Sequence, residues 1–380
     1  MNDTSLTPTL NSDILSKVNI VDDSDKLSQS DVAEEQTKQK LQKTKDKKID
    51  TLKPPLPSKP GLDIDDSMAE AARKIFLFHF GRMIHHEPGT RLGEDIESLH
   101  DMRVATRRMR AAMNIFETYL DPNVMAPFLK GMKQTRRALG AVRDLDVFWE
   151  KTESYLQTIP TNRQTELDLL RNIWQSERKS ARKNMLCYLD SKKYSKFKKS
   201  FGAFLKKPCA GALPVWKAPH QPRPHRLHHV IPFVIYERLA DVRAYDEWVT
   251  EPDAPIERLH QLRIACKGLR YTLEYFQEVL DPVAKELITE IKMLQDHLGD
   301  LQDAEVASDI LLNILKYGSW KQEKKFVTLP KRTTYGITAY MATRQRELND
   351  LVETFPKTWN RLKDCGFDEK VSKLILKLSA

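Results

Sequence analysis

The chain has 380 residues, enough to bury a sizeable core, and combines 40% hydrophobic and 30% charged residues with only 13 glycines, which favours helices over a strand-rich fold. Residues 1–60 carry ten lysines and ten acidic residues, so the net charge of +9 lies on the rest of the chain and favours anionic partners. No run approaches the ~20 apolar residues that span a bilayer, which excludes a membrane-spanning helix.

Residues 1–65 are the first segment along the chain. They are rich in Ser, Asp, Lys, Thr and Gln, contain no aromatic residue and end near a proline cluster at 54–60. Such a segment buries too little apolar surface to offset the entropy lost on ordering. The sequence therefore predicts a disordered polar tail over 1–65.

Residues 66–207 predict a first helical bundle. Its first helix is expected over 68–86, with Ser67 as N-cap and Pro88 just past its end. A second helix ends at Asp121-Pro122, and a third covers about 124–155. A long basic fourth helix over about 163–205 is expected to break near Asp190.

Residues 208–226 differ in composition from the segments on either side. Six prolines and four histidines fall between 208 and 232, and proline at this density prevents a continuous helix. We expect a linker over 208–226 and a second four-helix bundle over 227–380. The irregular spacing of the histidines favours a solvated linker over a metal site.

The cysteines and the first residues of the chain bear on the cellular compartment of the protein. Cys187, Cys209, Cys266 and Cys365 show no C-x-x-C spacing and no metal-ligand pattern. The chain opens with polar residues rather than the basic and then apolar pattern of a signal peptide. A cytoplasmic location in a reducing compartment, with no metal and no cofactor, is expected.

An internal repeat is the most informative feature. Residues 99–122 read LHDMRVATRRMRAAMNIFETYLDP and residues 259–282 read LHQLRIACKGLRYTLEYFQEVLDP, which align without gaps and agree at nine of 24 positions. A second pair follows, LGAVRDLDVF at 139–148 and LGDLQDAEVA at 298–307. The repeat predicts two related halves of one ancestral unit.

Cations line one face of both repeated helices. On a helical wheel of about 100° per residue they form a narrow stripe, and Met, Leu, Ala and Phe occupy the opposite face. The stripe residues are His100, Arg103, Arg107 and Arg110 in the first half and His260, Arg263, Lys267 and Arg270 in the second.

The stripes are more than ordinary solvated faces. Solvated faces mix signs, whereas these contain no acidic residue, and like charges one turn apart repel by a few tenths of a kcal/mol. A bound anion offsets that repulsion. Ten residues of helix span roughly 15 Å, which suits a chain of phosphates better than a single one. The position of His100 and His260 on the stripe favours phosphate contact over a structural role.

The third helix adds further cations to the predicted site. Lys133, Arg136 and Arg137 cluster on one side of it, whereas its counterpart keeps Lys292 but has Gln295 and Asp296 in the matching places. We include Lys133, Arg136, Arg137 and Lys292 in the site and expect the first half to bind more strongly.

Asp144 and Asp303 are the repeated acidic residues. Neither has a second acid at metal-ligand spacing, so a structural ion pair to a stripe arginine is favoured over a hydrolytic site. Gly140 and Gly299 precede them and are better explained by close helix packing than by a phosphate-binding loop. No nucleophile or metal constellation is found, so we predict no catalytic residues and no enzyme.

The paired LH-x-x-R-x-x-x-[RK]-x-x-R and LG-x-x-x-D motifs resemble those of the CHAD family, the conserved histidine α-helical domain, over residues 67–377. The resemblance implies an all-α fold of two four-helix bundles, related by a pseudo-twofold axis around a basic central groove or pore. It also implies binding of inorganic polyphosphate and association with polyphosphate granules. On this basis the two stripes are expected to line the groove.

Nucleic acid is the alternative partner, because its phosphate backbone also suits a basic groove. Proteins that bind bases or single strands usually place aromatic or amide side chains among the cations. Tyr271 is the only aromatic residue within or beside the stripes, which favours a ligand without bases.

Overall fold

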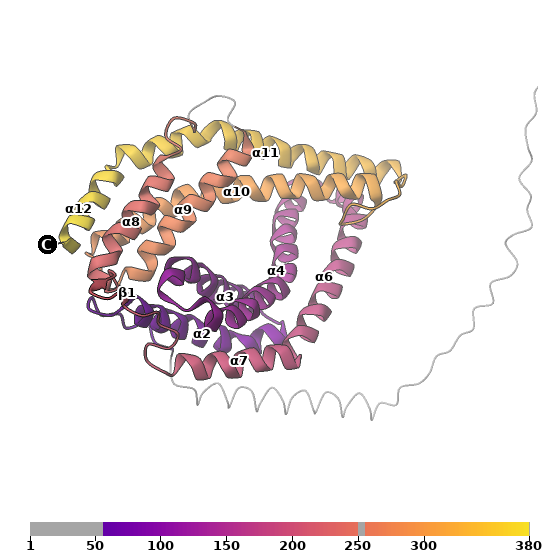
Figure 1. Cartoon of the computed structure of the whole chain (residues 1–380). Helices are drawn as coiled ribbons and strands as arrows, with labels where there is room; N and C mark the ends of the chain where they lie inside the picture. The colour runs from indigo at the N-terminus through magenta and orange to yellow at the C-terminus, as the bar shows by residue number, and fades with distance from the viewer. Residues whose placement is uncertain (1–55, 250–254, 380) are drawn as a thin grey trace, which may run out of the picture. The chain divides into compact units, whose positions relative to one another are not determined.

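The computed structural model describes residues 56–249 and 255–379, and regular structure in those ranges is almost entirely helical (Figure 1). This confirms the all-α prediction. The helices of eight or more residues are α2 (Met68–Leu92), α3 (Ile96–Phe116), α4 (Pro122–Thr158), α6 (Asp168–Leu189), α7 (Lys192–Leu205), α8 (Leu227–Arg243), α9 (Ile256–Phe276), α10 (Val283–Tyr317), α11 (Lys331–Asp364) and α12 (Phe367–Ser379). The short elements are α5 (Thr161–Gln164) and the 3₁₀ turns η1 (Glu117–Tyr119) and η2 (Thr165–Leu167).

Most helix boundaries follow the local sequence signals. Ser67 caps α2 by accepting the Glu70 N–H, and Asp121 caps α4 just before Pro122. The basic fourth helix is broken at Asp190 into α6 and α7, as predicted.

The predicted end of the first helix at residue 86 is wrong, because α2 continues through Pro88 to Leu92. It stops only at Gly93, whose φ of 72° is the left-handed conformation that favours glycine. The last turns are held against α3 by Thr90, whose hydroxyl lies 2.9 Å from the carbonyl oxygen of residue 86 and 3.0 Å from that of Ser98. Packing against α3 thus outweighs the backbone hydrogen bond that proline removes.

Part of the predicted tail is folded onto the helices. Gly61 and Leu62 each donate a backbone N–H to the Glu278 carboxylate at 2.9 Å, and Leu62 is buried. The predicted tail boundary at residue 65 is therefore wrong for residues 56–65. The prediction for residues 1–55 lies outside the described part of the chain.

The segment 208–226 pairs with the starts of two helices. It contains a small antiparallel pair, β1 (Trp216–Ala218) and β2 (Gln221–Pro222). Asp121 donates its N–H to the Gly211 carbonyl at 2.8 Å, and Met68 donates to the His225 carbonyl at 2.6 Å. The segment therefore connects the two halves and also fixes where α2 and α4 begin.

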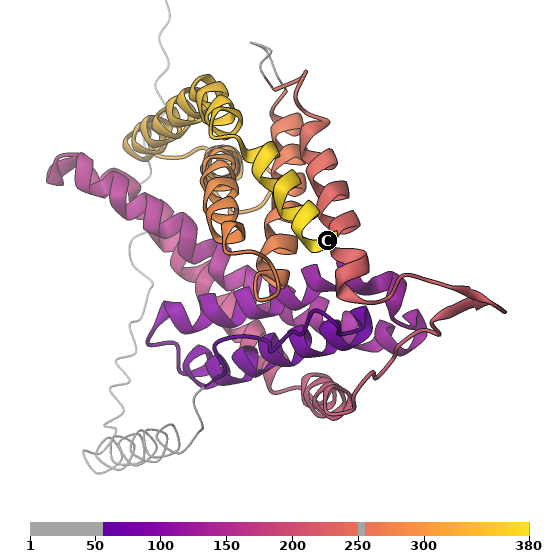
Figure 2. The same ribbon diagram turned by 90° about the vertical axis from the view of Figure 1, so that its left-hand side faces the viewer.

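The two halves meet along α3 and α9 (Figures 1 and 2). The Phe116 and Phe276 rings lie 5.9 Å apart, and the Tyr275 hydroxyl donates to the Arg108 carbonyl at 2.7 Å. Glu274 pairs with Arg108 across the interface at 2.9 Å. The predicted pseudo-twofold relation between two four-helix bundles stays a prediction.

A second hydrophobic core joins the halves at the other end of the long helices. Phe148 and Leu156 of α4 pack there with Leu311 of α10 and Tyr340 of α11. The halves are therefore held together by apolar contacts at two separate places, with α4 and α10 running between them.

Two glycines of α4 allow a test of this packing. A Cβ at Gly131 would lie 2.3 Å from the Phe197 ring, whereas the nearest atom to a Cβ at Gly140 is Nε of Arg103, at an ordinary 3.6 Å. Gly131→Ala should lower the free energy of unfolding by about 1–3 kcal/mol through overpacking. Gly140→Ala should raise it by up to about 1 kcal/mol through helix propensity. Denaturant unfolding of both variants measures the difference, and equal destabilisation would contradict this account of Gly140.

Candidate functional site

The cationic face of α3 and α9 lies opposite a buried apolar face, as the wheel predicted. Met102 and Met109 of α3 and Leu262 and Leu269 of α9 are completely buried. The two helices have matching bounds, offset by 160 residues. Their apolar sides fix the rotation of each helix, and this rotation directs the stripe cations out of the core.

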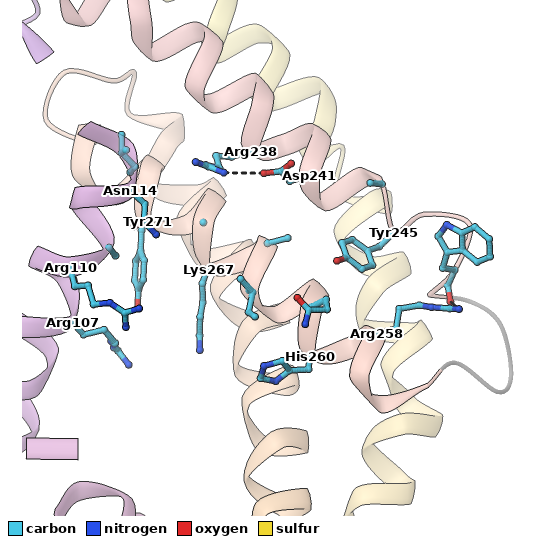
Figure 3. Close-up of a pocket in the computed structure, with 18 of the residues that line it drawn as sticks. Arg107, Arg110, Asn114, Arg238, Asp241, Tyr245, Arg258, His260, Lys267 and Tyr271 are labelled. Carbon is cyan, nitrogen blue, oxygen red and sulfur yellow. Dashed lines mark hydrogen bonds and ion pairs between the residues drawn. The ribbon is translucent and has the colours of Figure 1, made fainter. Parts of the chain in front are cut away.

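Two adjoining cavities, each of about 1140 Å³, are lined by six of the eight stripe cations. The first lies between α3, α8 and α9 (Figure 3), and the second is bounded mainly by α4, α6 and α10. Arg107, Arg136 and Lys267 line both cavities. The two spaces therefore meet at a group of positive charges that comes from both halves.

Four of these cations lack a carboxylate partner. Within the described ranges, no Asp or Glu oxygen lies within 4 Å of the charged groups of Arg107, Arg136, Arg263 or Lys267. The Nε atoms of the three arginines are buried and have no hydrogen-bond partner there. Buried polar groups normally have partners, so these three donors are unsatisfied within the described residues. We call these four residues the cation cluster.

Burial and mutual repulsion perturb the cations. Burial, with help from Arg263 and Arg107, lowers the pKa of Lys267 to about 8. Burial also lowers the pKa of Arg103 and Arg263, and the charge of Arg107 lowers both further. The charged forms are thus held at a cost that an anion would relieve.

The repeated acidic residues differ in their contacts. Arg103 donates to Asp144 at 2.8 Å, the ion pair that the sequence favoured. Asp303 makes no such pair with Arg263, although the two are close enough to affect each other's pKa. Burial raises the pKa of Asp303. Both acids line the second cavity, so they moderate its positive charge.

Most of the predicted residues lie where the wheel placed them. Arg103, Arg137 and Arg263 line the second cavity, and Arg110 and His260 line the first. His260 also forms a hydrogen bond through Nδ1 to Gln302, a residue of the second cavity.

Four predicted residues lie outside both cavities. Arg270 is buried against Glu274, at 3.3 Å, and against the Tyr271 ring, so its placement in the groove is wrong. Lys133 and Lys292 are exposed and border neither cavity. His100 also borders neither, and burial together with Arg143 lowers its pKa. The wheel gives a direction from the helix axis, but it does not show which neighbouring helix occupies that side.

Other lining residues lie outside the repeated motif and were missed. In the first cavity they are Arg238, Tyr245, Trp248 and Arg258, and in the second they include Lys151, Lys193 and Arg344. Arg258 lies on α9 just before the repeated motif, whereas the others belong to elements whose distance from the stripes is set by tertiary packing. Only the basic run at 192–199 gave a local signal for one of them, Lys193.

None of the helices in residues 56–249 and 255–379 combines the length and apolar character needed to cross a bilayer. Over the same ranges, no group of three or more His, Cys, Asp or Glu side chains is arranged to hold a metal ion.

The helical fold and the two adjoining cavities, lined by cations from α3, α9 and the helices around them, define the class of protein: an all-helical protein with a cation-lined site. The family model of the CHAD domain matches the sequence over residues 74–312, and the chain belongs to this family. Among solved structures it is similar to a crystal structure of the CHAD domain from the plant Ricinus communis, with 22% identity, a TM-score of 0.59 and coverage of 78% of this chain and 93% of that chain. It is also similar to PptA from Streptomyces chartreusis, with 14% identity, a TM-score of 0.56 and coverage of 78% and 100%. At these identities the likeness shows the fold alone, and no curated protein matches the chain.

The low pKa of Lys267 allows a direct test of the cation cluster. Its amine should lose its proton as the pH rises through about 8. Arg263→Gln removes a neighbouring positive charge and should move this pKa upward, toward the ordinary 10.5. An NMR titration of the Lys267 side chain measures both values. Lys133→Gln, at an exposed position outside the cavities, should leave the titration unchanged, and an unshifted pKa in Arg263→Gln would contradict the proximity of the two charges.

Proposed function

We propose that the protein binds inorganic polyphosphate in the two adjoining cavities. The observation that carries this proposal is the cation cluster, in which Arg107, Arg136, Arg263 and Lys267 converge without carboxylate partners in the described ranges. Membership of the CHAD family supports the same ligand. Burial and neighbouring cations lower the pKa of Lys267, and a ligand with many negative charges would offset this repulsion most.

The shape of the site suits a linear polyanion. Arg103, Arg107 and Arg110 follow one another along α3, so their guanidinium groups are spaced roughly one turn apart. Guanidinium groups bind phosphate oxygens through two parallel hydrogen bonds, and a lysine adds a compact point charge. A chain of phosphates can contact each cation in turn while it passes from one cavity to the other.

A binding module rather than an enzyme is part of this proposal. In the second cavity, Asp144 pairs with Arg103, and Asp303 is close enough to Arg263 to affect its pKa, so we assign both acids as counter-charges rather than as metal ligands or general bases. A cytoplasmic location with association to polyphosphate granules belongs to the proposal and follows from the family resemblance.

Single-stranded nucleic acid is the second candidate, and one observation favours it. Trp248 borders the first cavity with 46% of its surface exposed, and the guanidinium of Arg258 lies 5.0 Å from its ring centre. Tyr245 and Asn114 lie in the same cavity (Figure 3). Aromatic and amide groups among cations are typical of sites that stack bases.

Titration with polyphosphate and with single-stranded nucleic acid of matched charge separates these candidates. The variant Arg107→Gln with Lys267→Gln should weaken polyphosphate binding at least tenfold, about 1.4 kcal/mol. It should also reduce the dependence of log affinity on log salt by about 0.7 for each lost contact. The matched control is Lys133→Gln with Lys292→Gln, which removes the same charge from exposed positions outside the cavities and should change affinity less than threefold.

The outcomes are distinct. Equal weakening in both variants would reduce the site to general positive charge and refute the proposal. Tighter binding of nucleic acid than of polyphosphate, lost in Trp248→Ala, would favour the second candidate.

The affinity for polyphosphate should fall as the pH rises from 7 to 9. Lys267 is charged below its pKa of about 8 and neutral above it, so a contact is lost as the pH rises. Binding at pH 8 should therefore take up protons, which calorimetry in buffers of different ionisation enthalpy measures. Lys267→Arg keeps the charge and should remove both effects, so pH dependence that persists in this variant would assign it to another group.

A further inference from the structure

The α7 helix carries a second set of cations that lies outside the repeated motif. Its 14 residues include five lysines and no acidic residue, and Lys206 and Lys207 follow directly. Tyr194, Phe197 and Phe201 fix its inner face by packing against α2 and α4. The remaining lysines are therefore held away from the core on a well-anchored helix.

Three lysines of α7 share one exposed side, and two more exposed lysines follow its last turn. At about 100° per residue, Lys192, Lys196 and Lys199 fall within roughly 60° of one another, and Lys206 and Lys207 lie just beyond the end of the helix. We call these five lysines the α7 lysine face. Within the described residues none of the five has a carboxylate within 4 Å, whereas Lys198, on another side of the helix, pairs with Glu87 at 2.8 Å.

This arrangement is unfavourable without an anion. Lysines at 192 and 193 occupy the first turn, where the positive end of the helix dipole repels cations. An ordinary solvated face mixes acids with such charges, as α10 does where Glu286 and Glu290 lie in the sequence between Lys285 and Lys292. The α7 lysine face has no such compensation.

Lys193 connects this surface to the binding site. It is on the first turn of α7, next to Lys192, and it lines the second cavity together with Arg103 and Arg137. Positive charge therefore continues from the cavity onto α7 without an intervening acid in the sequence of that helix. From Lys192 to Lys206, the C-cap of the helix, the face extends for about 20 Å at 1.5 Å per residue, and Lys207 follows.

We propose that the α7 lysine face is an outer track that holds the part of a long polyphosphate chain that leaves the second cavity. This rests on the proposed function, since the track receives a chain already bound at the cation cluster. Long chains gain affinity from the track, whereas chains short enough to be held by the cation cluster do not. The protein therefore discriminates by chain length.

Charge reversal on α7, compared with a matched reversal on α10, tests the track. The test variant is Lys192→Glu with Lys199→Glu, and the control is Lys285→Glu with Lys292→Glu. Both pairs are exposed, lie seven residues apart and change the net charge by the same amount. The affinity of the full chain for tripolyphosphate and for long-chain polyphosphate is measured across a salt series.

The α7 variant should bind long chains about tenfold more weakly than the α10 variant does, a difference of about 1.4 kcal/mol. Its salt slope should fall by about 1.4, or 0.7 per contact. The two variants should bind tripolyphosphate equally. Lys192→Gln with Lys199→Gln should give about half of the change in log affinity, which separates loss of the track from misfolding.

Three outcomes would overturn the track. These are equal long-chain affinities in the two charge-reversed variants, an equal loss for tripolyphosphate and long chains in the α7 variant, or no effect of the neutral pair. If the wild-type protein binds neither ligand, the proposed function itself fails and the track fails with it. If cation-cluster variants weaken both ligands while α7 variants weaken neither, the proposed function stands and the track alone is refuted.

Discussion

Repulsion among the cation cluster is the constraint on which the rest of the structure depends. Four positive charges from α3, α4 and α9 are brought together without carboxylate partners in the described ranges, and burial disfavours the charged forms of Arg263 and Lys267. The free energy that holds them must come from elsewhere in the fold. It comes from the apolar faces of α3 and α9, which are buried along their whole length, and from the second core around Phe148 and Tyr340. The site is therefore kept open by contacts that lie away from it.

The interface between α3 and α9 shows how positive charge is divided between structure and site. Arg108 and Arg270 are paired with Glu274. Arg107, which precedes Arg108, and Lys267, three residues before Arg270, have no carboxylate partner in the described chain. A single half-buried acid, Glu274, thus neutralises both cations at the interface. Its removal would leave the buried Arg270 without a carboxylate partner, which makes the interface sensitive to substitution. Positive charge is therefore neutralised where α3 contacts α9 and is left unpaired in the cavities.

The sequence was sufficient for whatever depends on one helix at a time. The all-α class, the break at Asp190 and the apolar faces of α3 and α9 follow from local patterns, and so does the direction of Arg107 and Lys267. The positions of side chains that depend on a neighbouring element were not predicted, or were predicted wrongly. Arg270 points toward Glu274, Arg238 enters from α8, and Leu62 is docked by Glu278, and each of these needs a partner far away in the chain. Pro88 was misread for the same reason, because α3 supports the turn in which it lies.

The separation of 160 residues between α3 and α9 has a consequence for synthesis. At about 5–20 residues per second, the ribosome completes α3 roughly 10–30 s before α9. During that interval the chain is still attached to the ribosome. The arginines of α3, and the apolar face of α3 that will pack against α9, lack their partners. The backbone bond from Met68 to His225 and the bonds from Gly61 and Leu62 to Glu278 also await residues made much later. Final assembly of the cavity is therefore a late event in synthesis, and until α9 is made the cationic face of α3 lacks the partner helix beside it.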